Sequence, residues 1–348
     1  MQRRFLCWAA AALALAGCGT AGFPELEAPG YLRSGSPHAV ATDLFTKAIS
    51  LAPDRVGPLE LAGTAYLKWG YDAEADKLLG RILEIAPDDG YNLADTAAAY
   101  IEARREDRGL DFWAQAKKVG GAKARTWLPV ACAWARVGNV ARAEEFAAKL
   151  MALPGGWGLT EARRHRDLGF AWLDAGQKAR ADAALEKALA LGPENGLQMI
   201  EIGAALLVAG DRDRGEALLK KGYTLEKEAN AIQANREVAA AYITVGALAV
   251  AEPFAKTAIS LDPAEDDTYL VLGAAFLKAG KAAEGEDMLG RALRAAPGDW
   301  ELMARVGAQW LSLEPAAGRK SMRAAPAGAL PAAGPAPAPG PEGGEPTP

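Results

Sequence analysis

The chain has 348 residues, a formal net charge of −5 and 50% hydrophobic residues, a balance typical of a soluble globular fold. The mild charge argues against a general nucleic-acid binder, and three Cys with two His exclude a disulfide framework or a conventional zinc site. Aromatic residues make up only 7% of the chain while Ala and Gly are abundant, which favours close-packed helices over a strand-rich sandwich.

The first 17 residues have the features of a secretory signal peptide. Arg3 and Arg4 form a positive start, an apolar run follows from Phe5 to Leu15, and small residues come next. This run is far shorter than the ~20 apolar residues that a transmembrane helix needs. We therefore predict that residues 1–17 are a signal peptide for export.

The segment Leu15-Ala16-Gly17-Cys18 follows this apolar run directly and resembles the lipobox of bacterial lipoproteins. The resemblance implies that the Cys18 thiol carries covalent lipid (palmitate-type acyl chains) and becomes the first residue of the mature chain. Gly19 stands where many lipoproteins retained in the inner membrane have Asp. The resemblance thus implies a lipid anchor in the outer membrane with the protein facing the periplasm, and no other cofactor or metal is predicted.

Residues 18–36 contain Pro, Gly and Ser and are predicted to be a flexible tether between the lipid and the folded part. Cys132 would then be the single remaining thiol, since Cys7 leaves with the signal peptide and Cys18 carries lipid. We interpret Cys132 as a small helix residue, with a reactive or intermolecular thiol as the alternative.

A period of 34 residues runs through the rest of the chain. Repeats are predicted near 37–55, 56–89, 90–123, 124–157, 162–195, 196–229, 232–265 and 266–299, with a last helix at 300–313. The eighth position of each full frame is tiny and the eleventh is large, as in Gly169 with Trp172 and Gly203 with Leu206. Most frames have Gly at position fifteen, and several close with Pro, as at Pro193.

This pattern resembles the tetratricopeptide repeat, whose unit is two antiparallel helices joined by a short turn. The resemblance predicts an all-α, right-handed superhelical solenoid over residues 37–313, because one unit cannot bury its own apolar face and neighbours must stack. The unit at 37–55 matches only half of the pattern, and Trp300–Leu313 matches only the first helix. We predict that this last helix caps the exposed end, and that the Pro-, Ala- and Gly-rich residues 315–348 are disordered.

In tetratricopeptide proteins, positions 2, 5, 9, 12 and 13 of the first helices line the concave face. The resemblance thus gives a candidate partner-binding groove with an apolar middle and several Arg at one side. Its members are Arg125, Leu128, Arg136, Arg163, Arg166, Phe170, Leu173, Ile200, Leu207, Arg236 and Ile243. Such a surface suits a segment with apolar anchors and acidic residues. The alternative is that the apolar members pack on neighbouring helices and the Arg are solvated.

No set of residues indicates catalysis. His38 is expected in a loop before the repeats, and His165 at a core-type helix position, so neither forms an expected nucleophile–base pair. Asp211 and Asp213 alternate with Arg212 and Arg214, so helix capping is expected there rather than calcium binding.

The sequence predicts a non-enzymatic scaffold that binds a protein partner of the cell envelope, such as a secretin, a porin-like protein or an export component, and no nucleic acid. Lipoproteins with similar repeats assist type IV pilus and secretin assembly or scaffold exopolysaccharide export, which favours a role in assembling an outer-membrane, secretion or pilus complex. The alternatives are an exopolysaccharide-export scaffold or glycan-binding module, for which Trp69, Trp113 and Trp157 are the candidate residues, and a regulatory adaptor for a periplasmic enzyme.

Overall fold

The computed structural model describes residues 36–156 and 159–313. These residues form sixteen helices and no strand, apart from one isolated bridge between Gly156 and Leu159. The predicted all-α repeat solenoid is therefore confirmed. The predicted signal peptide, tether and C-terminal tail lie outside the described residues.

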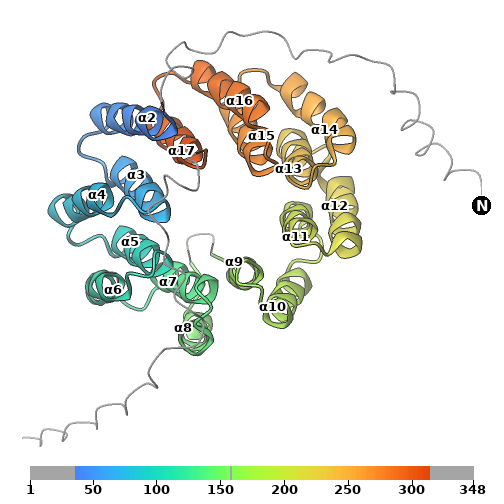
Figure 1. The fold of residues 1–348 in the computed structure, drawn as a ribbon. Coiled ribbons are helices and arrows are strands. Elements are labelled where there is room, and N and C mark those ends of the chain that lie inside the picture. The colour runs from blue at the N-terminus through green and yellow to red at the C-terminus, as the bar shows by residue number, and fades with distance from the viewer. Residues whose placement is uncertain (1–35, 157–158, 314–348) are drawn as a thin grey trace, which may run out of the picture.

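The helices form two concentric layers, and the solenoid closes into a ring (Figure 1). The inner layer consists of α3 (Val56–Lys68), α5 (Gly90–Glu102), α7 (Ala124–Arg136), α9 (Glu161–Asp174), α11 (Gly196–Val208), α13 (Ala231–Thr244), α15 (Asp266–Lys278) and α17 (Trp300–Leu311). The outer layer consists of α2 (Pro37–Leu51), α4 (Asp72–Ile85), α6 (Glu106–Gly120), α8 (Val140–Ala152), α10 (Lys178–Leu191), α12 (Arg212–Glu226), α14 (Leu248–Leu261) and α16 (Ala282–Ala295).

Each inner helix from α3 to α15 packs against the outer helix that follows it, and a tight turn joins the two. Six of these turns contain a Gly with positive φ, between 69° at Gly176 and 90° at Gly210, a conformation that residues with a Cβ rarely adopt. The turn between α5 and α6 places Arg104 in the same conformation, with φ 62°. Arg104 stands at position fifteen of its repeat, where most repeats have Gly, so nothing in the sequence indicated a positive φ there.

The tiny residues at position eight bring the two helices of a unit together. A Cβ built on Gly63 would lie 2.6 Å from Leu79 Cδ2, and one built on Gly169 would lie 2.5 Å from Leu185 Cδ2. In both units the Gly is at position eight and the Leu at position twenty-four of the repeat. Close packing of this kind leaves no room for a larger residue.

The last inner helix makes this same contact with the first helix of the fold. A Cβ built on Gly307, at position eight of α17, would lie 2.8 Å from Cε1 of Phe45 in α2. Phe45 therefore has the place that Leu79 and Leu185 have in their own units. α17 and α2, from opposite ends of the described chain, together form one composite repeat.

α2 also contacts the next unit as an outer helix does. Thr42 Oγ1 lies 2.8 Å from the Tyr66 hydroxyl of α3, and the Tyr100 hydroxyl donates to Asp76 Oδ1 at 2.7 Å between the equivalent positions of α4 and α5. On the inner side, a Cβ on Gly57 of α3 would lie 2.5 Å from the Trp300 ring of α17. The joint between the chain ends thus repeats the geometry of the internal joints.

The composite repeat changes the role predicted for the last helix. α17 covers α15 and α16 as expected, but it does not cap a free end, because its other side is packed against α2 and α3. The largest apolar cluster includes Leu44 and Phe45 of α2 together with Val306 and Trp310 of α17. The predicted solenoid of helix pairs is thus, in the structure, closed into a ring, and the helix predicted to cap its end completes the closing repeat.

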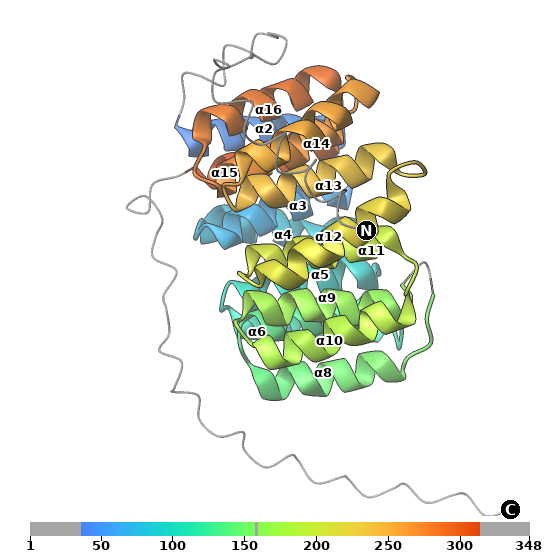
Figure 2. The same ribbon diagram turned by 90° about the vertical axis from the view of Figure 1, so that its right-hand side faces the viewer.

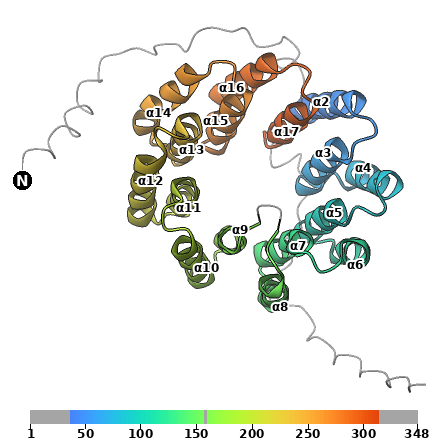
Figure 3. The same ribbon diagram turned by 180° about the vertical axis from the view of Figure 1, so that it is seen from behind.

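All helices run roughly parallel to the axis of the ring, as the side view shows (Figure 2). The turns within pairs therefore lie on one face of the ring, here called the turn face, and the connections between pairs lie on the other. In the composite repeat no turn joins the two helices, because α17 is the last helix and α2 the first. The end of α17 and the start of α2 lie where the other repeats have their turn. The first and last described residues, Ser36 and Leu313, consequently lie at the turn face, beside the joint between α2 and α17 that Figure 3 shows from behind.

Candidate functional site

The inner layer carries a groove that crosses four successive helices, α9, α11, α13 and α15, with a volume of about 570 Å³. Its floor is formed by Ala side chains, namely Ala204, Ala205, Ala240, Ala241, Ala274 and Ala275. Phe170, Leu173, Val208 and Val271 provide the larger apolar surface, and Asp174, Glu237 and Lys278 provide its charges. The groove is thus shallow, mostly apolar and close to neutral.

A smaller pocket of about 370 Å³ lies further along the inner layer, across α5, α7 and α9. Four predicted groove residues line it, namely Arg125, Leu128, Arg136 and Arg163. Two more predicted residues, Phe170 and Leu173, line the larger groove. The predicted surface is therefore divided between a polar pocket and an apolar groove.

The structure corrects the placement of three predicted groove residues. Ile200, Leu207 and Ile243 are at most 5% exposed and lie in the core between helices. Ile200 packs toward α12, since a Cβ on Gly222 would lie 2.9 Å from Ile200 Cγ1. Their side chains stabilise the joints of the ring and offer no surface to a partner.

The predicted Arg are all paired with carboxylates of the same layer. Arg125 donates to Asp95 at 2.7 Å, and Arg136 lies 2.7 Å from Glu102 and 3.1 Å from Asp174. Arg163 lies 3.7 Å from Asp167. These pairs join α5, α7 and α9 along the inner face, so the predicted cluster of Arg at one side of the groove is neutralised by carboxylates.

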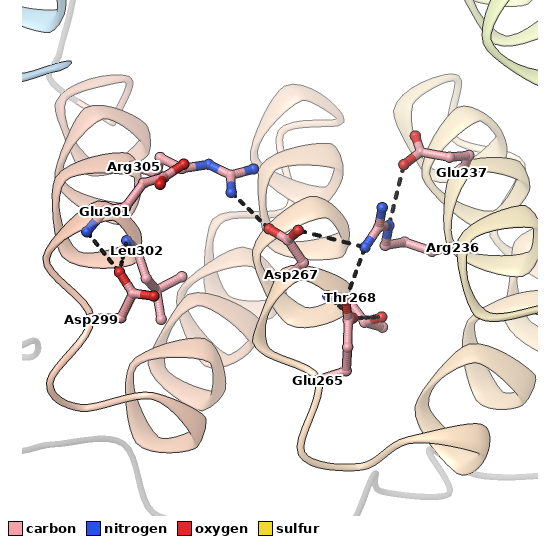
Figure 4. Close-up of polar contacts among 9 residues, drawn as sticks. All are labelled: Arg236, Glu237, Glu265, Asp267, Thr268, Asp299, Glu301, Leu302 and Arg305. Atoms are coloured by element: carbon pink, nitrogen blue, oxygen red, sulfur yellow. Dashed lines mark hydrogen bonds and ion pairs between the residues drawn. The ribbon is translucent and has the colours of Figure 1, made fainter. Parts of the chain in front are cut away.

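The pairing continues around the ring. Arg166 contacts Asp167 and Glu201, and Arg236 lies 3.2 Å from both Glu237 and Glu265. Asp267 is shared between Arg236 at 3.9 Å and Arg305 at 2.7 Å, which links α13, α15 and α17 (Figure 4). Each pair contributes little energy alone. An acidic partner would have to compete with these resident carboxylates, so the inner face favours a neutral, apolar occupant.

The generic lining positions predicted part of the groove. Ala204 and Ala240 stand at position nine, one of those positions, and they line the groove as the resemblance implies, whereas the α15 residues, such as Ala274, were missed. Val271 and Glu237 stand at position six, outside those positions. A run of Ala at position nine in consecutive repeats was the signal that could have located the floor.

Neither histidine belongs to a catalytic arrangement in the described part of the chain. His38 lies within α2 rather than in a loop, with its ring 4.3 Å from that of Tyr71. Burial lowers the pKa of His165, which lies 3.7 Å from Glu161. No group of three or more potential metal ligands occurs among the described residues.

The side chain of Asp211 does not cap α12, although the sequence predicted that it would. Its carboxylate accepts from Lys178 at 3.0 Å and from Arg214 at 3.2 Å, and it makes no side-chain cap bond to α12. Cys132 is buried, and this burial raises the pKa of its thiol to about 12. A thiol in that state is unreactive at neutral pH.

Two of the three aromatic residues considered for glycan binding, Trp69 and Trp113, are described, and neither offers an exposed platform. Trp113 is 6% exposed and packs edge-on against Trp127 at 4.8 Å, and Trp69 packs partly buried against the core. Trp157 lies outside the described residues. Over residues 36–156 and 159–313, no helix is both long and apolar enough to span a membrane.

Glu60 on α3 faces Asp95 and Asp89, and burial together with these neighbouring charges raises its pKa from 4.5 to about 8. Between these two values the unfolded chain loses the proton that the folded chain keeps, so the stability of the fold falls as the pH rises. We expect Glu60→Gln to leave stability at pH 4 unchanged and to raise it on the order of 2 kcal/mol at pH 8. Chemical denaturation of both proteins across this pH range measures the effect, and parallel curves would contradict it.

No protein-family model matches the chain, and no curated protein matches its sequence. Similar solved structures include a chain of the APC/C hetero-tetramer Cut9-Hcn1, at 14% identity and a TM-score of 0.34, covering 79% of this chain and 53% of that one. The present chain therefore spans about half the length of that chain.

Two further similar structures are YrrB, described as a TPR protein with an unusual peptide-binding site, and a human IFIT1 dimer with PPP-AAAA. YrrB has 20% identity and a TM-score of 0.28, covering 53% of this chain and 92% of its own. IFIT1 has 14% identity and a TM-score of 0.35, covering 76% and 70%. These identities and TM-scores are too low to assign an activity or a partner to this chain.

Proposed function

We propose that this chain is a non-enzymatic scaffold whose inner groove binds a segment of a partner protein. The observation that carries the proposal is the apolar groove across α9, α11, α13 and α15, in which Phe170, Leu173, Val271 and the 52% exposed Val208 lie together. Exposed apolar surface of this kind is typical of interaction sites. Helices form the wall of the groove. A wall whose backbone is already ordered loses little conformational entropy when a partner binds.

We further propose that the scaffold is a lipid-anchored lipoprotein of the outer membrane, facing the periplasm, where it assists assembly of a secretion, pilus or other outer-membrane complex. The lipobox-like segment ending at Cys18 supports the anchor. α2 starts at Pro37 on the turn face. Since 19 residues span at most ~65 Å, the anchor would keep the ring within about that distance of the membrane.

The anchor is tested with Cys18→Ser in cells grown with labelled fatty acid. We expect the wild-type chain to carry the label and to sediment with outer membranes, and the variant to lose both properties. Label that stays on the variant, or a wild-type chain without label, would refute lipidation at this residue.

The groove is tested by affinity capture from detergent-solubilised envelopes with Val208→Arg. The substituted side chain is exposed, so the ring should fold normally, and the added charge should abolish capture of the partner. Val250→Arg on the outer helix α14, where Val250 is 42% exposed, is the matched control and should retain it. Equal capture by both variants would contradict the groove assignment, and a soluble enzyme as the groove-dependent partner would favour the adaptor role over assembly.

A further inference from the structure

The larger groove opens at the turn face of the ring. Four of its lining residues, Asp174, Val208, Thr244 and Lys278, are the last residues of their inner helices. Each of these helices is followed by a turn Gly, from Gly176 to Gly280. A segment that approaches from the turn face can therefore enter the groove without crossing the ring.

The C-terminal part of this chain starts at that same face. α17 runs in the same direction as α15 and packs beside it, and the described chain ends at Leu313, directly after α17. Packed helices lie about 8–10 Å apart, so the step from α17 past α15 and α13 to α11 measures roughly 30 Å. Residues 314–323, at ~3.1 Å per residue in polyproline II geometry, would cover that span.

The residues that follow match the chemistry of the groove. Between Ala324 and Pro341 the sequence contains only Ala, Gly, Pro and a single Leu330, without any charge. The Ala side chains of the groove offer few hydrogen-bond acceptors to the backbone N–H groups of a bound segment. Proline has no backbone N–H group, so a Pro residue leaves no donor unsatisfied there. Proline-rich segments are also extended before binding, so they lose little entropy when they dock.

We propose that residues 324–341 of this chain dock in the groove of α9, α11, α13 and α15, with Leu330 against Phe170 and Leu173, and that a partner must displace them. The proposal uses the same groove as the proposed function and adds a competing occupant. Because the segment is covalently attached, its effective concentration at the groove is in the millimolar range. Weak docking would therefore suffice to keep the groove filled.

A photo-crosslinking amino acid placed at Val208 in the full chain tests the proposal. After irradiation of the purified protein, mass spectrometry should find adducts between position 208 and residues 324–341 at the mass of one chain. The same probe at Val250, on the outer side of α14, should give no such adduct. Leu330→Asp should reduce the adduct at position 208 at least fivefold.

The absence of tail adducts at position 208, or equal adducts at both positions, would overturn the proposal. Tail adducts only at the mass of two chains would overturn it too, since the occupant would then be a second copy. The experiments distinguish a tail that does not dock from a groove that binds no partner. If no tail adduct forms and Val208→Arg still abolishes partner capture, the groove binds a partner without an internal competitor.

Discussion

Replacing Phe45 by Ala is expected to lower the free energy of unfolding by about 3–5 kcal/mol. Phe45 is 2% exposed and belongs to the largest apolar cluster, where it packs on α17 beside Gly307 and edge-on against Tyr66 at 5.1 Å. Its removal would leave a cavity at the joint where the two ends of the fold meet. Thermal or chemical denaturation followed by circular dichroism measures the loss.

Leu51→Ala on the same helix is the control for this experiment. Leu51 is 51% exposed, so its truncation should change stability by only a few tenths of a kcal/mol. If Phe45→Ala is as mild as Leu51→Ala, then α2 is a loosely attached leader, and the composite repeat is wrong.

Replacing Gly203 by Leu is expected to destabilise the ring by about 3 kcal/mol or more, at the upper end of the range for overpacking. A Cβ on Gly203 would lie 2.8 Å from the Leu219 nitrogen and 2.9 Å from the Gly215 oxygen. Both are backbone atoms of α12, so α11 and α12 would have to separate to admit any side chain. Denaturation of the variant measures the cost.

Gly80→Ala is the matched control, since Gly80 lies inside α4 and a Cβ there would meet nothing within 4 Å. This substitution should raise stability by about 0.5–1 kcal/mol, because Ala loses less backbone entropy than Gly in a helix. A Gly203→Leu variant as stable as the wild type would show that the assigned contact between α11 and α12 is wrong.

The repeat unit could be predicted from the sequence because its physics is local. The spacing of Gly169, Trp172, Ala181 and Leu185 determines where two helices approach, and each of these residues is buried as that pattern requires. The turn Gly were equally visible, because positive φ is a property of a single residue. Arg104 was missed because it adopts a positive φ although it is not a Gly.

Ring closure could not be predicted from these local patterns, because it depends on the rotation accumulated over all the repeats. A signal was nevertheless present in the two unpaired ends. Residues 37–55 match only the second helix of a unit and residues 300–313 only the first, so the two ends complement each other. A linear array has two end units with one neighbour each. The composite repeat gives every unit two neighbours.

The groove could be predicted only in part, because generic lining positions take no account of local packing. Ile200 and Leu207 stand at lining positions, but the Gly residues of α12 let that helix approach so closely that both become buried. The Arg were correctly placed on the inner layer, yet their partners Glu102, Asp174 and Asp267 belong to other repeats. Such pairs appear only once the helices are side by side.

A double-mutant cycle between Phe45 and Gly307 tests ring closure most directly. Gly307→Ala adds a methyl group that clashes with the Phe45 ring, and Phe45→Ala removes that ring. We therefore expect the two changes to be non-additive, with the double variant more stable than the sum of the single effects by about 1–3 kcal/mol. A parallel cycle of Phe45→Ala with Gly169→Ala, whose methyl would meet Leu185, should be additive. Additivity between Phe45 and Gly307 as well would contradict a closed ring.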